Sequence, residues 1–349
     1  MANEHLHAAD RAHALNPTPT GDRIVEYYVP FEELIAGARI ETALSDAVEA
    51  GQRVAIVGPS GSGKTSLCEW VLGQEQPGFA TVRIPVGVER EEIVSEPDQF
   101  LQHVIRTLTQ YALDASLINV KEREQALRAS GRRIMRPGIQ TTDRAALGLP
   151  RWLLQGDVAR DVTAFVEGVD QDRSAGAILE VLRRLIAFIS DLELRPIFLI
   201  DDSDAWLNID GVTDRTGLIS AFFGRVLRVL AELPAGLVVA VHASYLEREG
   251  FREQVEGFLE RKVEVPLLTN GAVGQVLLHR LRSIDGQIEV ADVFTPEAID
   301  ELHGYYGGAA RASVRRTLQV AQRAVQVAAE AGSEVVSPEV VEAAVSDWV

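Results

Sequence analysis

The stretch VAIVGPSGSGKT, from Val54 to Thr65, decides the fold. Its second part, GPSGSGKT, matches the pattern G-x-x-x-x-G-K-[ST] and lies between an expected strand and an expected helix. Glycines let backbone N–H groups approach an anion closely, and the helix dipole adds to the attraction. The stretch therefore predicts a phosphate-binding loop whose contacts come from Gly58, Pro59, Ser60, Gly61, Ser62, Gly63, Lys64, Thr65 and Ser66.

Two side chains of this loop and two later aspartates have predicted roles around ATP and Mg²⁺. Lys64 is expected to reach the β- and γ-phosphates, and the Thr65 hydroxyl is expected to ligate Mg²⁺. The apolar strand PIFLI is followed by Asp201, the expected second Mg²⁺ partner. Asp202 then stands where an ATPase places the carboxylate that orients the attacking water. Helix capping is the alternative role for Asp202, and Asp204 offers the same group.

Strand and helix patterns alternate along the first three quarters of the chain, which is typical of a parallel sheet covered by helices on both faces. From residue 270 the pattern is helical throughout. The predicted fold is an α/β P-loop NTPase sheet followed by a small all-helical lid domain. The expected elements are helices at 31–51, 65–73, 98–113, 177–192, 216–233 and 245–260, and strands at 52–58, 79–86, 195–202, 236–244 and 262–268.

The same patterns divide the chain into three parts. Residues 1–26 lack an apolar run and are expected to form a flexible tail. Residues 27–268 are expected to form the ATPase core, with an inserted segment at about 113–175 that breaks the alternation. Residues 269–349 are expected to form the lid.

Composition excludes several classes of function. The 349 residues carry a net charge of -17, so attraction of the whole chain to DNA or to an anionic membrane is not expected. The apolar runs are shorter than the roughly 20 residues that a bilayer requires. Cys68 is the single cysteine, which excludes an internal disulfide and a cysteine-based zinc site and fits a reducing, cytoplasmic compartment.

One basic segment departs from this acidic background. Residues 121–151 contain eight Lys or Arg against three Glu or Asp. A solvated helix and loop explain this composition, and so does a surface that meets nucleic acid or an acidic partner. If the segment binds DNA, neutralising Arg132, Arg133 and Arg136 is expected to abolish the effect.

The phosphate loop, the paired aspartates and the helical C-terminus together resemble the AAA+ ATPases, in particular the origin-recognition clade. The stretches VPLLTNGAVGQVLLHRL and FTPEAIDELHGYYGGAARASVRRTLQVAQRAVQVA resemble that family's lid with its G-x-x-R signature. The resemblance covers residues 27–347 apart from the insertion. It implies that Arg311 contacts the γ-phosphate from the lid. It also implies a phosphate sensor at the end of strand 236–244, either Ser244 or His242.

The resemblance further implies a site completed between subunits. A neighbouring subunit's arginine would reach the γ-phosphate, with Arg261 in the expected position and Arg252 as the alternative. The N-terminal segment would contact adenine or pack within the core through Tyr27, Tyr28, Val29 or Pro30.

Two departures from the family shape the functional expectation. The sequence ends at Val349 without the winged-helix domain of origin-binding members, so sequence-specific reading of duplex DNA is not expected. Asp202 replaces the more usual glutamate, which resembles the nucleotide switches of the STAND group and is consistent with slow turnover.

Together these features predict an ATPase that hydrolyses Mg-ATP to drive conformational change or assembly, as a homo-oligomer or with a partner protein, away from membranes. One alternative is a nucleotide-dependent switch or scaffold with little turnover in a signalling or defence complex. The other is a DNA-remodelling helper for transposition or replication.

Overall fold

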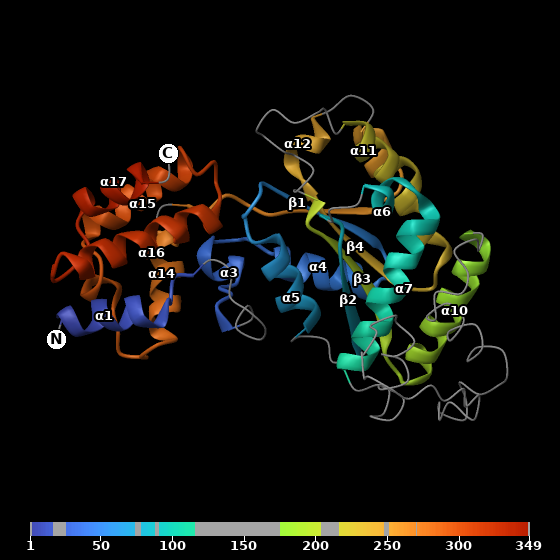
Figure 1. Cartoon of the computed structure of the whole chain (residues 1–349), viewed down its shortest axis with the longest axis horizontal. Coiled ribbons are helices and arrows are strands. Elements are labelled where there is room, and N and C mark those ends of the chain that lie inside the picture. Colours follow the sequence, from blue (N-terminus) through green and yellow to red (C-terminus); the bar gives the residue numbers. More distant parts are fainter. Residues whose placement is uncertain are drawn as a thin grey trace, which may run out of the picture. The chain divides into compact units, whose positions relative to one another are not determined.

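The computed structural model describes residues 2–16, 26–73, 78–87, 91–115, 175–203, 216–247, 251–269 and 271–347 (Figure 1). The predicted insertion at 113–175, with the basic segment 121–151, lies almost wholly outside these ranges, and so does Asp204. The chain divides into two compact units. The first comprises Met1–Pro77, Ala240–Glu249 and Leu259–Val349, and the second comprises Gly78–Val239 and Gly250–Phe258.

A five-stranded sheet in the order β2-β3-β4-β1-β5 confirms the predicted α/β fold. The ladders that join β2 to β3, β3 to β4 and β1 to β5 are all parallel. The central strands are buried because they are continuous apolar runs, as expected for a sheet covered on both faces. The strands are β1 Arg53–Gly58, β2 Phe79–Pro85, β3 Arg195–Asp201, β4 Gly236–His242 and β5 Arg261–Glu264.

Helices of the second unit pack beside β2 and β3. Figure 1 shows α7 and α10 side by side, and Phe100 of α7 meets Phe222 edge to face with 5.4 Å between ring centroids. The helix expected at 216–233 changes type twice, with a π-helical turn around Gly224. The elements are α6 Glu92–Ser95, α7 Pro97–Asp114, α10 Ala175–Asp191, α11 Thr216–Ala221, η2 Phe222–Val226, η3 Leu227–Glu232 and α13 Phe251–Glu256.

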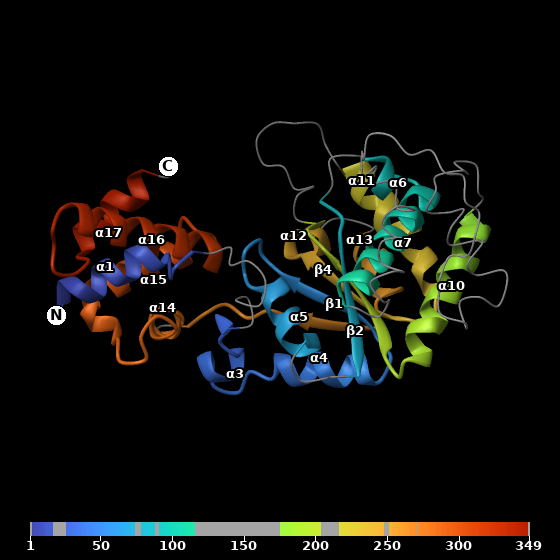
Figure 2. The same cartoon turned by 60° about the horizontal axis from the view of Figure 1, so that its bottom comes forward.

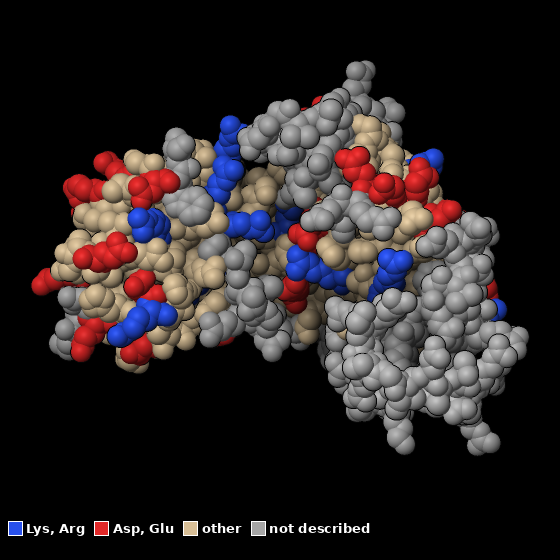
Figure 3. Space-filling view, viewed as in Figure 1, with Lys and Arg blue, Asp and Glu red and all other residues tan. Residues whose placement is uncertain are grey.

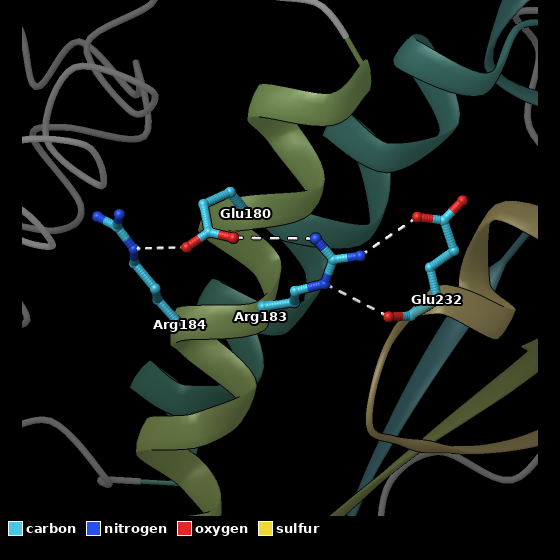
Figure 4. A network of polar contacts seen from close by, with 4 residues as sticks. All are labelled: Glu180, Arg183, Arg184 and Glu232. Atoms are coloured by element: carbon cyan, nitrogen blue, oxygen red, sulfur yellow. Dashed lines mark hydrogen bonds and ion pairs between the residues drawn. The ribbon is translucent and has the colours of Figure 1, made fainter.

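A polar network joins α10 to the end of η3 (Figure 4). Arg183 Nη2 lies 3.2 Å from Glu232 Oε2, and Arg183 Nη1 lies 3.8 Å from Glu180 Oε2. Arg184 Nε binds the other oxygen of Glu180 at 3.2 Å. These side chains are 32–59 % exposed, so each pair is expected to contribute about 1 kcal/mol or less to stability.

In the first unit, the helix expected at 31–51 is two helices, α3 Phe31–Leu34 and α4 Ile40–Glu49. Gly37 lies between them with φ of +83°, a conformation that interrupts a helix and that glycine adopts without steric cost. The other helices of the core part of this unit are α5 Lys64–Gly73 and α12 Ala243–Leu246.

The predicted helical C-terminus is confirmed. Side-chain caps stabilise the first turns of two of its helices, α15 and α16. Thr295 Oγ1 accepts from Ala298 N, and Ser313 Oγ accepts from Arg316 N. On the face shown in Figure 3, these helices carry Asp and Glu side chains interspersed with Lys and Arg. The elements are α14 Ala272–Arg282, η4 Val290–Asp292, α15 Pro296–Gly307, α16 Val314–Glu330 and α17 Pro338–Ser346.

The prediction of a flexible tail at 1–26 was wrong for residues 2–16. Helix α1, Ala2–Ala12, packs against α16, as both Figure 1 and Figure 2 show. Leu6 and Leu15 are fully buried, and Leu15 N donates to Gln322 Oε1 at 3.1 Å. The sequence interpretation required a long apolar run, whereas a short amphipathic helix needs only a few apolar residues on one face.

Arg280 of α14 contacts Asn16 and Tyr27, which follow α1 in the sequence. It is 7 % exposed, its Nη1 donates to Asn16 O at 2.6 Å, and its guanidinium carbon lies 5.0 Å from the centre of the Tyr27 ring. Burial lowers the pKa of Arg280 to about 10.

We expect Leu6→Ala to lower the free energy of unfolding of the first unit by about 2–4 kcal/mol, because it empties a fully buried position. Urea unfolding followed by circular dichroism measures the change. The matched control is Arg11→Ala on the exposed face of the same helix, which should change stability by less than about 0.5 kcal/mol. Equal effects of the two substitutions would contradict the docking of α1.

His103 of α7 predicts a pH dependence of stability. Its Nε2 lies 2.9 Å from Pro85 O, and burial lowers its pKa. The unfolded chain, with a His pKa of about 6.5, then binds more protons than the folded chain, so stability falls as the pH falls below about 6.5. In urea titrations between pH 5 and 8, the difference between the protein and His103→Gln should shrink toward acid. A difference that does not vary with pH would be inconsistent with a lowered pKa.

Candidate functional site

The loop between β1 and α5 has the conformation that a phosphate loop requires. Gly61 and Gly63 have φ of 72° and 99°, a region that side-chain-bearing residues rarely adopt. Lys64 is 5 % exposed, and its Nζ donates to Gly58 O at 3.1 Å and Pro59 O at 2.8 Å. The loop's own carbonyls thus hold the ammonium group over the turn.

Two further features fit a phosphate at this loop. A Cβ atom at Gly58 would lie 2.7 Å from Ser62 Oγ, so a larger residue there would displace the Ser62 side chain. Ser62 Oγ is buried and makes no hydrogen bond to the described residues, although a buried hydroxyl normally has a partner. Thr65 and Ser66 follow on the first turn of α5 and are half-buried. The residues present therefore fit the predicted nucleotide.

The N-terminus of α16 contacts the loop within the same unit. Arg315 N donates to Gly61 O at 3.2 Å, and a Cβ at Gly61 would collide with Ser313 Oγ. Arg311, the predicted lid arginine, is exposed and has a left-handed backbone with φ of 50°, followed by Ala312 at 60°. Such residues cost of order 1–3 kcal/mol each, so the surrounding fold must impose them. Sequence reasoning missed Arg315, although it stands in the same ARASVRR stretch.

In the second unit, one arginine spans both predicted aspartates. Arg83 Nη2 lies 2.9 Å from Asp201 Oδ2 and 3.4 Å from Asp202 Oδ2. Asp201 ends β3 with 4 % of its side chain exposed, whereas Asp202 has 44 % exposed and φ of 65°. Sequence reasoning missed Arg83, because its proximity to Asp201 follows only from the pairing of β2 with β3.

His242 and Ser244 contact each other, so the two sensor candidates form one group. His242 ends β4 and caps α12: its Nδ1 accepts from Ser244 N at 3.2 Å and lies 2.8 Å from Ser244 Oγ. Because Nδ1 accepts a backbone N–H, we assign the ring proton to Nε2 and the Ser244 hydroxyl as a donor to Nδ1. A polar ligand of Ser244 Oγ would thus also orient the imidazole.

The two candidate inter-subunit arginines differ in their surroundings. Arg252 Nε binds Glu256 Oε1 at 2.8 Å, one turn along α13. Arg261 is exposed and forms no ion pair with the described residues. It pairs in register with Val54, at the opposite end of β1 from the phosphate loop. Arg261 therefore lies about 13 Å along the sheet from Gly58, where its own loop begins, at about 3.3 Å per residue.

The predicted adenine segment is anchored to the phosphate-loop helix. Tyr28 OH and Phe31 N both donate to Glu41 Oε1 at 2.6 Å, and the Tyr28 ring packs on Trp70 of α5 with 5.4 Å between centroids. Burial, together with Glu41, raises the pKa of Tyr28. Tyr27 and Tyr28 are buried, whereas Val29 and Pro30 are half-exposed. Sequence reasoning did not identify Glu41, which is 3 % exposed.

Arg83→Ala should lower the free energy of unfolding by about 1–2 kcal/mol, because it leaves the buried Asp201 carboxylate without this ion pair. The value is below that for a fully buried pair since Arg83 is 40 % exposed. Urea unfolding without nucleotide measures it, with Arg225→Ala, whose pair with Glu96 is exposed, as the control. Stability equal to that of the control would show that the Arg83 pair contributes little.

Comparison with known protein families gives a match over part of the chain. A family model described as ABC transporter matches residues 42–181, which is less than half of the chain and includes the phosphate loop. No curated protein matches the sequence. Among the described residues, no helix is both long and apolar enough to cross a membrane.

Several solved structures have a fold similar to that of this chain. Cdc6p from Pyrobaculum aerophilum matches with a TM-score of 0.50 and 14% identity, over 94% of this chain and 71% of that one. The Aeropyrum pernix ORC2 protein, in ADPNP-ADP complexes, matches with a TM-score of 0.48 and 17% identity, over 94% and 72%. The Aeropyrum pernix ORC1 protein, in complex with DNA, matches with 0.47 and 19%, over 93% and 66%.

At these identities the likeness concerns the fold alone. The chain has a P-loop NTPase fold followed by a helical C-terminal region, similar to that of Cdc6p from Pyrobaculum aerophilum. The predicted resemblance to the origin-recognition AAA+ ATPases is thereby confirmed at the level of the fold.

Proposed function

We propose that the protein binds and hydrolyses Mg-ATP and uses the cycle to change conformation or to assemble with copies of itself or a partner. The observation that carries this proposal is the phosphate loop. Lys64 is buried and held by the carbonyls of Gly58 and Pro59, and the Ser62 hydroxyl of the same loop has no hydrogen-bond partner among the described residues. An incoming phosphate offers both groups a stronger, charge-assisted hydrogen bond.

The other residues have roles that follow from their chemistry. The Thr65 hydroxyl and the Asp201 carboxylate would hold Mg²⁺, which neutralises phosphate charge when bound. The loop N–H groups and Lys64 would orient the β- and γ-phosphates. Ser244, with its hydroxyl already ordered by His242, would respond to the terminal phosphate.

Asp202 is the proposed group that orients and deprotonates the attacking water. Arg83 Nη2 donates to Asp202 Oδ2 at 3.4 Å, so the arginine competes with the attacking water for this carboxylate. Turnover is expected to be slow unless nucleotide or a partner draws Arg83 away.

The lid would report the nucleotide state through α16. Its N-terminus already binds Gly61, and Arg311 and Arg315 stand on either side of the cap residue Ser313. A phosphate that reorients the loop would move this helix. Arg261, distant from its own loop, would act on a neighbouring subunit's nucleotide, so hydrolysis would require an oligomer.

A second function is supported by the Arg83–Asp202 pair. If that pair stays closed in the nucleotide complex, the protein binds ATP or ADP without turnover and serves as a switch or scaffold. The DNA-remodelling alternative depends on residues 121–151, which lie outside the described residues. Cys68, the single cysteine, is buried and forms no disulfide, which agrees with the cytoplasmic location that we propose.

The test is phosphate release from ATP over a wide range of protein concentration. We expect turnover per subunit to rise with concentration, to disappear in Lys64→Ala together with nucleotide binding, and to fall by about 10²–10⁴ in Asp202→Asn. Arg83→Ala should raise turnover several-fold if the ion pair restrains Asp202.

Nucleotide binding that is lost in Lys64→Ala, with no phosphate release from any variant including Arg83→Ala, would replace the ATPase by the switch. Nucleotide binding that survives Lys64→Ala unchanged would contradict the whole proposal.

A further inference from the structure

A pocket on the first unit lies outside the phosphate loop. It has a volume of about 330 Å³ and lies along α4, with Arg261 of the edge strand β5 on its far side. From α4 and its flanks come Arg39, Thr42 and Asp46, and Gln52 closes the end before β1. The space exists because Ala43 and Ala47 stand on the same face of α4, where larger side chains would fill it.

Two guanidinium groups in this pocket are without partners. Neither Arg39 nor Arg261 forms an ion pair with any described residue, and both are exposed. Neighbouring cations differ: Arg53 binds Glu260 at 2.9 Å, and Lys262 binds Glu264 at 2.7 Å. In a chain with 51 acidic residues and a net charge of -17, two unpaired arginines that line one pocket are a local reversal of charge.

We propose that this pocket binds the phosphate groups of a nucleotide polyphosphate chain, with Arg39 and Arg261 acting as a pair. A guanidinium donates two parallel hydrogen bonds to a phosphate, and two such groups match a chain of linked phosphates better than a single carboxylate. The Gln52 amide and the Thr42 hydroxyl supply neutral donors at the same wall.

Asp46 moderates this site. Its carboxylate lines the same pocket and has no ion-pair partner among the described residues, so it repels an incoming anion. The pocket therefore binds phosphate weakly and reversibly. Removing the Asp46 charge should strengthen the same interaction that removing either arginine weakens, and by more than a charge change of the same size at an exposed residue outside the pocket.

The phosphate has two possible sources. It is free nucleotide in solution, or it is the terminal phosphate of a nucleotide held in the loop of a second copy. The second source rests on the proposed function and extends it: Arg39 joins Arg261 in reaching the neighbour. Either source fits the position of Arg261 beside Val54, remote from the loop of its own subunit.

The first experiment uses inorganic tripolyphosphate as the probe and Lys64→Ala as the background, so that the phosphate loop does not contribute. Isothermal titration calorimetry at low salt should detect one weak site. Arg39→Gln and Arg261→Gln should each weaken it about tenfold or more, and Asp46→Asn should tighten it several-fold. The matched control is Lys262→Gln, which removes one positive charge next to Arg261 and should change the affinity less than about twofold.

Absence of binding in the Lys64→Ala background, or binding that survives loss of both arginines, would overturn the proposal. An Asp46→Asn effect no larger than that of Lys262→Gln would do the same, because the probe would then be sensing only net charge. These outcomes would not contradict the proposed function of the phosphate loop, because nucleotide binding by the unmodified protein is measured separately with a fluorescent ATP analogue.

The second experiment separates the sources by mixing two variants. Lys64→Ala subunits keep the pocket, and subunits with both Arg39→Gln and Arg261→Gln keep the phosphate loop. If the pocket acts on a neighbour, adding the first slows release of the fluorescent ATP analogue from the second and restores phosphate release. If it takes free nucleotide, mixing has no effect while tripolyphosphate binding to the first variant persists.

Discussion

The ammonium group of Lys64, held by the carbonyls of Gly58 and Pro59, is the contact on which the rest of the site depends. It requires a buried strand that ends at Gly58, a turn whose glycines have positive φ, and a helix that begins at Lys64 itself. The parallel sheet satisfies the first condition and α5 the last. A cation that already lies among backbone dipoles needs little rearrangement to meet phosphate, which is the physical meaning of a preorganised anion site.

Acidic and basic side chains are paired unevenly in the two proposed sites. Asp201 and Asp202 share Arg83, whereas Arg39 and Arg261 stand without carboxylate partners among the described residues. The two acidic groups proposed for metal and water thus share the charge of one arginine. A metal ion would supply the positive charge that this pair of carboxylates still requires, and phosphate would supply the negative charge that Arg39 and Arg261 require. Whether the protein acts as an ATPase or as a nucleotide-dependent switch depends on how readily Arg83 leaves Asp202.

Much of this was predictable from local sequence. The loop, the strand before it, the aspartates after PIFLI and the C-terminal helices each have a signature within about ten residues, and the structure contains them. The tail prediction failed because burial of Leu6 and Leu15 depends on α16, some 300 residues away. Three further residues were missed for the same reason, because their contacts have no local sequence pattern. The contact of Arg83 follows from the pairing of β2 with β3, that of Glu41 from the fold of the segment before α4, and that of Arg315 from the position of α16 beside the phosphate loop.

The hydrogen bond from Arg315 N to Gly61 O makes the phosphate loop and α16 parts of one equilibrium. If the loop turns toward a phosphate, the hydrogen bond from Arg315 N to Gly61 O changes, and the N-terminus of α16 loses or gains a contact. Linkage requires the converse with equal magnitude: a partner that grips α16, or the α1 helix packed on it, shifts nucleotide affinity by the same factor by which nucleotide shifts the partner's. A partner that binds helix α1 would thus change the nucleotide affinity of the phosphate loop from a distance, through α16.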